Sequence, residues 1–187
     1  MRSLVPILTA LMTAWSLAAG APAPAGPAGD LWAPLQFLVG GWSGTGSGQP
    51  GEVLTGTTSF SFELGKKILV LKNRAESAPK PGEKTGDRTG DKTGAVHEDL
   101  LIIYEQPGES RLRAIYFDNE GHAINYRVLS SGKPNKAVFE SAGSGKTPRF
   151  RLTYELNQDG AMTTEFSMAP PGGDFKPYTT GKVKRVP

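Results

Sequence analysis

The sequence predicts an all-β protein, a single closed antiparallel up-and-down β-barrel of about ten strands with a short N-terminal helical turn. Short segments of alternating apolar and polar residues follow one another at regular spacing, with turn residues between them. Before them stands LQFLVGGWSGTGSG (residues 35–48), an apolar turn that runs into a glycine-rich stretch with a tryptophan. Glycine inside a strand marks a sharp bend or the close approach of another backbone, and many small closed barrels begin in this way.

Ten segments have the residue pattern of strands. The first contains Trp42, and the others cover residues 54–63, 67–74, 98–105, 111–118, 123–129, 136–141, 149–156, 161–168 and 179–186. The turns at residues 118–121 and 157–160 end on glycine, as tight hairpin connections do, so we expect an antiparallel meander. About ten strands is also the number at which a sheet of this length curls and closes.

The chain has 187 residues, which favours one domain. Residues 1–20 combine Arg2, a mostly apolar stretch and small residues, which is the pattern of a signal peptide. We therefore expect a periplasmic or secreted protein with no membrane association after cleavage, and an uncleaved anchor is the alternative. Residues 21–29 read as an Ala/Pro/Gly tether and residues 30–187 as the barrel domain. Because there is no cysteine, packing alone must stabilise this domain.

One segment inside the barrel domain differs in composition from the strands around it. Residues 76–96, ESAPKPGEKTGDRTGDKTGAV, repeat a short polar unit and contain almost nothing apolar, which predicts a disordered low-complexity insert. The net charge of the whole chain is only +3, and the charges of both signs are interspersed. We therefore expect no nucleic-acid partner, since such partners need clustered cations.

The alternation also assigns candidate ligand-binding residues to the inner face of the barrel. Tyr116, Tyr126 and Tyr154 fall on the apolar side of their strands, as does Phe166. Because buried tyrosine hydroxyls need hydrogen-bond partners, we expect an interior that is not purely apolar. These four residues are the predicted ligand site.

Motifs for catalysis or phosphate binding find little support. The stretches GSGQPG (residues 46–51) and GSGKT (residues 143–147) are similar to nucleotide-binding loops, but strand residues follow both where a helix is required. No G-x-S-x-G elbow is present. The acids that the alternation places, Glu140, Glu155 and Glu165, fall on the outer face. We therefore predict no catalytic residue.

A metal site is also poorly supported. His97, Glu98 and Asp99 have metal-ligating side chains, but neighbours along a strand point to opposite faces, so the three cannot converge. His122 follows a turn, where a hydrogen bond to Asp118 is the ordinary explanation.

Four segments carry a resemblance to a known family. LQFLVGGWSGTGSG, AIYFDNEGHAINYRV, RFRLTYEL and MAPPGGDFKPYTTGKVKRV resemble bacterial proteins of unknown function grouped with the nitrobindin-like and lipocalin-like (fatty-acid-binding-protein-like) β-barrels. The resemblance covers most of residues 35–186 and implies a closed barrel with an internal cavity. Nitrobindins hold haem through a histidine near their C-terminal end. This chain has no histidine after His122 and carries Phe175, Lys176 and Tyr178 in the matching region, so we expect no haem and no other cofactor.

These observations favour non-enzymatic binding of a small, largely apolar ligand in the barrel cavity. An exported scaffold or protein-interaction domain with a filled core is the first alternative, and the identity of a protein partner would then be unknown. An enzyme with an unrecognised site is the second alternative. It rests only on the fact that one fold can host many functions.

Overall fold

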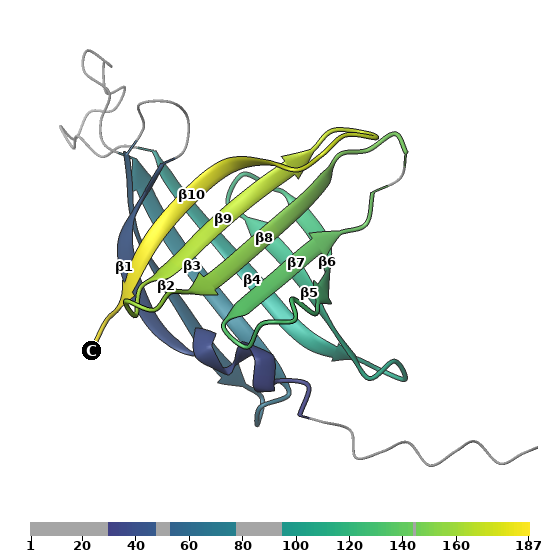
Figure 1. Cartoon of the computed structure of the whole chain (residues 1–187), viewed down its shortest axis with the longest axis horizontal. Helices are drawn as coiled ribbons and strands as arrows, with labels where there is room; N and C mark the ends of the chain where they lie inside the picture. Colours follow the sequence, from purple (N-terminus) through teal and green to yellow (C-terminus); the bar gives the residue numbers. More distant parts are fainter. Residues whose placement is uncertain (1–29, 48–52, 78–94, 144) are drawn as a thin grey trace, which may run out of the picture.

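The computed structural model describes residues 30–47, 53–77, 95–143 and 145–187, which form one barrel (Figure 1). Strands that are adjacent in the sequence pair antiparallel, and β1 pairs with β10 to close the barrel. The elements are the 3₁₀-helix η1 (Ala33–Leu38) and the strands β1 (Gly40–Ser47), β2 (Val53–Glu63), β3 (Ile68–Ser77), β4 (Val96–Gln106), β5 (Arg111–Asp118), β6 (Ala123–Leu129), β7 (Lys136–Ser141), β8 (Arg149–Leu156), β9 (Met162–Ala169) and β10 (Lys176–Arg185). The predicted ten-strand antiparallel barrel with a short helical turn is confirmed.

Some of the predicted segments lie outside the residues that the structure describes. The predicted signal peptide (residues 1–20), the tether (residues 21–29) and residues 78–94 of the predicted insert lie outside them. In the described part of the chain, no helix has the length and apolar character needed to cross a membrane.

Two predicted boundaries were wrong. Strands β3 and β4 extend into both ends of the predicted insert, where Glu76 pairs with Val96 and the Ser77 amide donates to the Ala95 carbonyl at 3.0 Å. Strand β10 begins three residues before the predicted start at residue 179, and its register shifts between Pro177 and Thr179. The irregularity follows from the proline, which has no amide hydrogen to contribute to the ladder.

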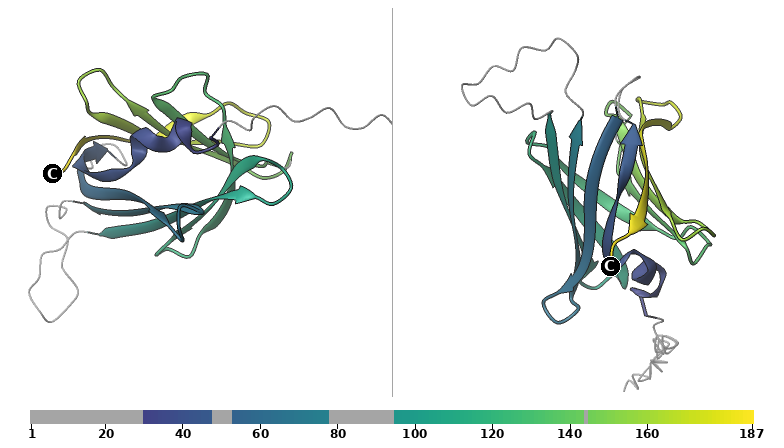
Figure 2. Two further views of the ribbon diagram at one scale, coloured as in Figure 1. Left: turned by 90° about the horizontal axis from the view of Figure 1, so that it is seen from below. Right: turned by 90° about the vertical axis from the view of Figure 1, so that its left-hand side faces the viewer.

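One end of the barrel is closed by η1, which lies across it (Figure 2). Pro34 stands in the first turn of the helix, where its missing amide hydrogen costs nothing. The spacing of Leu35 and Leu38 matches the three residues per turn of a 3₁₀-helix, so both point into the barrel, with exposures of 1% and 0%. The helix therefore acts as an apolar plug.

Behind this plug the barrel is filled by side chains. The largest buried side chains of the core are Trp42, Phe60, Phe139, Leu35, Leu38, Leu69, Leu71, Leu101, Ile103 and Met162. The Tyr154 ring makes edge-to-face contacts with Phe60 and Phe139, with centroids 5.4 and 6.0 Å apart. Such pairs stabilise a core beyond the area that they bury.

Closure of the barrel depends on the junction between β1 and β10. A Cβ atom on Gly44 would meet the Lys182 carbonyl oxygen and would lie 2.7 Å from the Cα atom of Val183. Beside this junction, the Arg185 guanidinium lies over the Trp42 ring at 4.4 Å and donates hydrogen bonds to the carbonyls of Val39 (2.6 Å) and Phe37 (3.2 Å). The arginine thus connects the last strand to the segment that leads out of η1.

The glycine contact can be tested by adding one methyl group. We expect Gly44→Ala to destabilise the barrel by about 1–3 kcal/mol, because backbone atoms of β10 would have to move. For a domain of this size, that loss lowers the melting temperature by roughly 3–10 °C. Gly145→Ala is the matched control, since nothing lies within 4 Å of its added Cβ. Equal melting temperatures of the two variants by differential scanning calorimetry would contradict the role of Gly44 in closure.

Candidate functional site

Three tyrosines and a carboxylate point into the barrel. Tyr116 on β5, Tyr126 on β6 and Tyr154 on β8 face inward, and the exposures of Tyr126 and Tyr154 are only 2% and 8%. Burial raises the pKa of each hydroxyl, and the charge of Asp99 on β4 raises all three further. The structure therefore brings the three predicted tyrosines together as neutral hydroxyl groups near Asp99.

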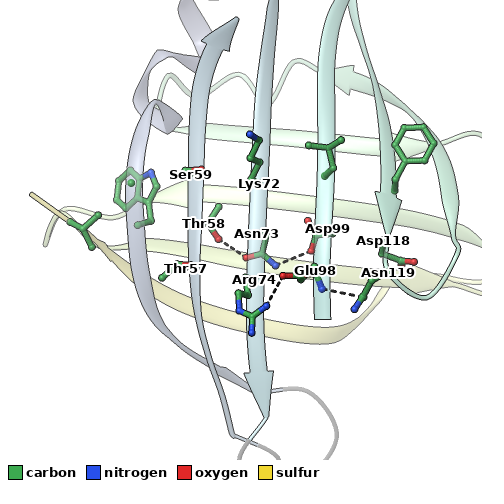
Figure 3. A pocket seen from close by; sticks show the side chains of 15 residues that line it. Thr57, Thr58, Ser59, Lys72, Asn73, Arg74, Glu98, Asp99, Asp118 and Asn119 are labelled. Carbon is green, nitrogen blue, oxygen red and sulfur yellow. Dashed lines mark hydrogen bonds and ion pairs between the residues drawn. The ribbon is translucent and has the colours of Figure 1, made fainter. Parts of the chain in front are cut away.

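Asp99 belongs to a row of polar side chains that crosses three strands. Thr58 on β2 donates a hydrogen bond of 2.6 Å to the Asn73 side-chain carbonyl on β3, and the Asn73 amide donates one of 2.8 Å to Asp99 (Figure 3). The three residues are register partners, so they share the inner face. Each buried polar group in this row has a partner, as burial requires.

His97 connects this row to the barrel mouth, the end opposite η1. Its Nε2 atom lies 3.3 Å from the Asp99 carboxylate and 3.2 Å from the Tyr116 hydroxyl, and its Nδ1 atom lies 3.1 Å from the Glu120 carboxylate. The hydrogen bond to Asp99, supported by the one to Glu120, raises the pKa of His97 to about 9. The imidazole is therefore charged at neutral pH and donates from both ring nitrogens.

A second inward carboxylate lies opposite Asp99. Asp118 is its register partner on β5, and the Asp118 side chain is only 4% exposed. The predicted contact with His122 is present, since His122 Nδ1 lies 2.8 Å from Asp118 and the His122 amide donates to it at 2.9 Å. Burial works against the charged form of Asp118, but the hydrogen bonds from His122 and the Glu120 amide hold its pKa below the usual range.

Sequence reasoning missed both of these acids. It placed only outer-face acids, although His97, Asp99, Leu101 and Ile103 alternate along one face of β4. As predicted, Glu98 takes the other face, where it pairs with Arg74. In the described residues, no group of three or more ligating side chains is arranged to hold a metal ion.

Phe166 lies in a separate aromatic group, away from the plug. Its ring stacks on Phe150 at 5.9 Å and meets Tyr178 edge-on at 6.0 Å. Tyr178 is 52% exposed and stands at the register shift in β10. The structure therefore places Phe166 at the mouth, with no ring contact to the three tyrosines.

Two depressions mark the described surface. One of about 630 Å³ is lined by outer-face side chains of β2–β5, among them Thr57, Lys72 and Phe117, and also by Thr58, Asn73 and Asp99 of the polar row and by Asp118. The other, of about 530 Å³, lies beside η1. None of the four predicted ligand-binding residues lines either depression.

Comparisons with known proteins bear on the fold. No protein-family model matches this chain, and no curated protein sequence matches it. The crystal structure of Rv2717c from M. tuberculosis is similar at 14% identity, covering 84% of this chain and 98% of that one with a TM-score of 0.52. At this identity the likeness extends to the barrel fold and no further.

Two other barrels are less similar in structure. A de novo designed fluorescence-activating β-barrel has 12% identity and a TM-score of 0.42, and covers 84% of this chain and 99% of that one. A DUF3598-family protein of unknown function from Nostoc punctiforme has 10% identity and a TM-score of 0.30 with the same coverage.

The charge state of His97 leads to a prediction for its titration. In a His122→Gln background, proton NMR of the single remaining imidazole should give a midpoint near pH 9. Asp99→Asn should lower this midpoint more than Glu120→Gln, because Asp99 is the larger cause of the shift.

The same shift predicts how stability depends on pH. Since the folded pKa of His97 exceeds the ordinary value of 6.5, its contribution is complete below pH 6.5 and disappears as the pH rises through about 9. In urea titrations, His97→Gln should remove this part of the pH dependence. A midpoint near 6.5 in the NMR titration would overturn both predictions.

Proposed function

We propose that this protein binds a small, largely apolar ligand at the barrel mouth without catalysing a reaction. One observation carries the proposal: in the described part of the chain, the Tyr126 hydroxyl is a buried side-chain polar atom without a hydrogen-bond partner. Leaving such a group unpaired costs about 1–3 kcal/mol. A ligand that offers a hydrogen-bond acceptor to this hydroxyl would recover that free energy.

The surroundings of Tyr126 suggest the chemistry of the ligand. Tyr126 is the register partner of Ser141, and the Ser141 hydroxyl accepts a hydrogen bond from the Phe150 amide at 2.8 Å. Phe150 and Phe166 provide a stacked aromatic wall, which suits an aromatic or aliphatic body. Because the neutral Tyr126 hydroxyl can donate a hydrogen bond and has no partner among the described residues, we propose a ligand with one carbonyl or ether oxygen on an apolar frame.

A second candidate function is a scaffold or interaction domain with a filled core. It is favoured by the dense packing behind η1 and by the linings of both depressions, which include none of the three tyrosines. Under this alternative, a structural water would satisfy the Tyr126 hydroxyl.

Export and family grouping are also proposals. The composition of residues 1–20 supports a periplasmic or secreted location, and the segments resembling nitrobindin-like proteins support a place among those barrels. We do not extend the grouping to haem, because neither histidine suits the iron. His97 is charged at neutral pH and meets acceptors through both nitrogens, and His122 is held by Asp118.

The ligand proposal can be tested with a fluorescent ketone. The probe 6-propionyl-2-(dimethylamino)naphthalene combines an apolar ring system with a carbonyl acceptor. We expect Tyr126→Phe to weaken its binding about two- to tenfold, because one neutral hydrogen bond is lost. The variant should keep the stability of the parent or gain slightly, since the deleted hydroxyl has no partner. Fluorescence titration and urea unfolding measure the two effects.

Tyr104→Phe is the matched control, because Tyr104 lies on the outer face of β4 and loses the same hydroxyl. It should leave probe affinity unchanged. The scaffold alternative predicts no saturable binding to the parent protein, or equal affinities of the two variants. Either result would overturn the proposal.

Haem binding is tested directly by titrating hemin into the purified protein. We expect no sharp, stoichiometric Soret band, since His97 is held by Asp99 and Glu120 and His122 by Asp118. A band that saturates at one equivalent and disappears in His97→Gln would contradict this prediction.

A further inference from the structure

The depression beside η1 has features of a second binding site. It occupies about 530 Å³, within the usual range for small-molecule sites, between the helical plug and the turn that connects β6 to β7. None of the three tyrosines lines it, although Ala137, which does, is the register partner of Tyr154. We call this depression the plug cleft.

The floor of the plug cleft is apolar. Leu31 and Pro34 line it from the η1 segment, Leu112 from β5, and Val128 and Leu129 from β6. Leu112 is buried, and Leu31, Val128 and Leu129 are half-buried, so apolar side chains reach the surface here without full cover. An occupant with an apolar body would complete their burial.

The rim of the plug cleft is basic. Arg111, Lys133 and Lys136 line it, and the one carboxylate among their partners is Glu155, at 3.5 Å from Lys133 and 2.9 Å from Lys136. Arg111 forms no ion pair with any residue that the structure describes. The two lysines therefore share one carboxylate while Arg111 adds a further positive charge, and a single anionic group on the occupant would be attracted to this rim.

The turn that carries two of these cations is held in place. The Ser131 hydroxyl donates toward the carbonyls of Lys133 (2.9 Å) and Lys136 (2.7 Å), and the Asn135 amide donates to the Leu156 carbonyl on β8 at 2.7 Å. These bonds tie the turn to the barrel wall. The backbone that positions the basic rim is thus ordered before any ligand arrives, which lowers the entropic cost of binding.

We propose that the plug cleft is a binding site for an amphiphilic anion, a small molecule with an aromatic or acyl body and one carboxylate or sulfonate group. The body lies on the floor beside Leu112 and Leu129, and the acid group lies between Arg111 and Lys133. This site is independent of the proposed function at the mouth, because it uses other residues and a different ligand charge.

Two fluorescent probes with nearly the same ring system test the proposal. 8-Anilinonaphthalene-1-sulfonate carries a sulfonate, and N-phenyl-1-naphthylamine lacks it. We expect the full protein to bind the sulfonate probe at least tenfold more tightly. The double substitution Arg111→Gln/Lys133→Gln should weaken binding of the sulfonate probe at least fivefold and leave the neutral probe unchanged. Both residues are exposed, so the fold should persist, as far-UV circular dichroism will verify.

The control removes the same charge elsewhere. Lys176→Gln/Lys184→Gln changes two exposed lysines of β10 that do not line the plug cleft, and it should leave both affinities unchanged. Equal affinities of the parent for the two probes would overturn the proposal, as would equal effects of the two double variants. If binding of the sulfonate probe is lost only in Tyr126→Phe, the probe binds at the mouth, and this result would also overturn the proposal. The ketone titration of Tyr126→Phe is a separate measurement, so either site can fail alone.

Discussion

The closure of the sheet between β1 and β10 is the constraint on which the rest of this structure depends. A sheet of ten strands leaves two edges with unpaired backbone groups unless its first and last strands meet. Here Gly44 and Gly46 let the backbone of β10 approach more closely than side chains would permit. Arg185 then joins the end of β10 to the segment behind η1, so the same junction that closes the wall also anchors the plug.

Closure divides the interior into two chemically different halves. On the plug side, the core is built mainly from apolar side chains, and the buried Trp42 indole N–H donates to the Leu38 carbonyl at 2.8 Å. On the mouth side, the row from Thr58 through Asn73 to Asp99 places hydrogen-bonding groups inside the wall. Burying such groups is costly unless each has a partner. The charged His97 beside Asp99 serves as one of these partners, and the Tyr126 hydroxyl is the place where the pairing is incomplete.

The barrel mouth and the plug cleft therefore differ in the chemistry of their side chains. The mouth combines neutral tyrosine hydroxyls with a stacked pair of phenylalanines. The carboxylates of Asp99, Asp118 and Glu120 outnumber the charged His97 there, so an anion would be disfavoured. The plug cleft presents apolar side chains under a basic rim. Under the two proposals, one barrel has a neutral and an anionic ligand preference at two separate places.

The sequence by itself determined the strands, their hairpin order and the face on which most side chains lie. Alternation with a period of two suffices for this, because it reports whether a residue points inward. The alternation placed the side chains of Tyr126 and Tyr154 on the inner face, where the structure has them. The glycines before residue 48 indicated a close approach of two backbones. It could also have placed Asp99 inside, since Leu101 and Ile103 continue the same face.

Only the tertiary structure decided which inward residues meet. The edge-on contact of the Tyr116 and Tyr126 rings depends on the register of β5 and β6, and the opposition of Asp99 and Asp118 depends on that of β4 and β5. Registers are set by packing and turn geometry across the whole barrel, and a local pattern carries no information about them. The plug cleft has the same origin, because η1 and the β6–β7 turn meet only after β1 has found β10 at the other end of the chain.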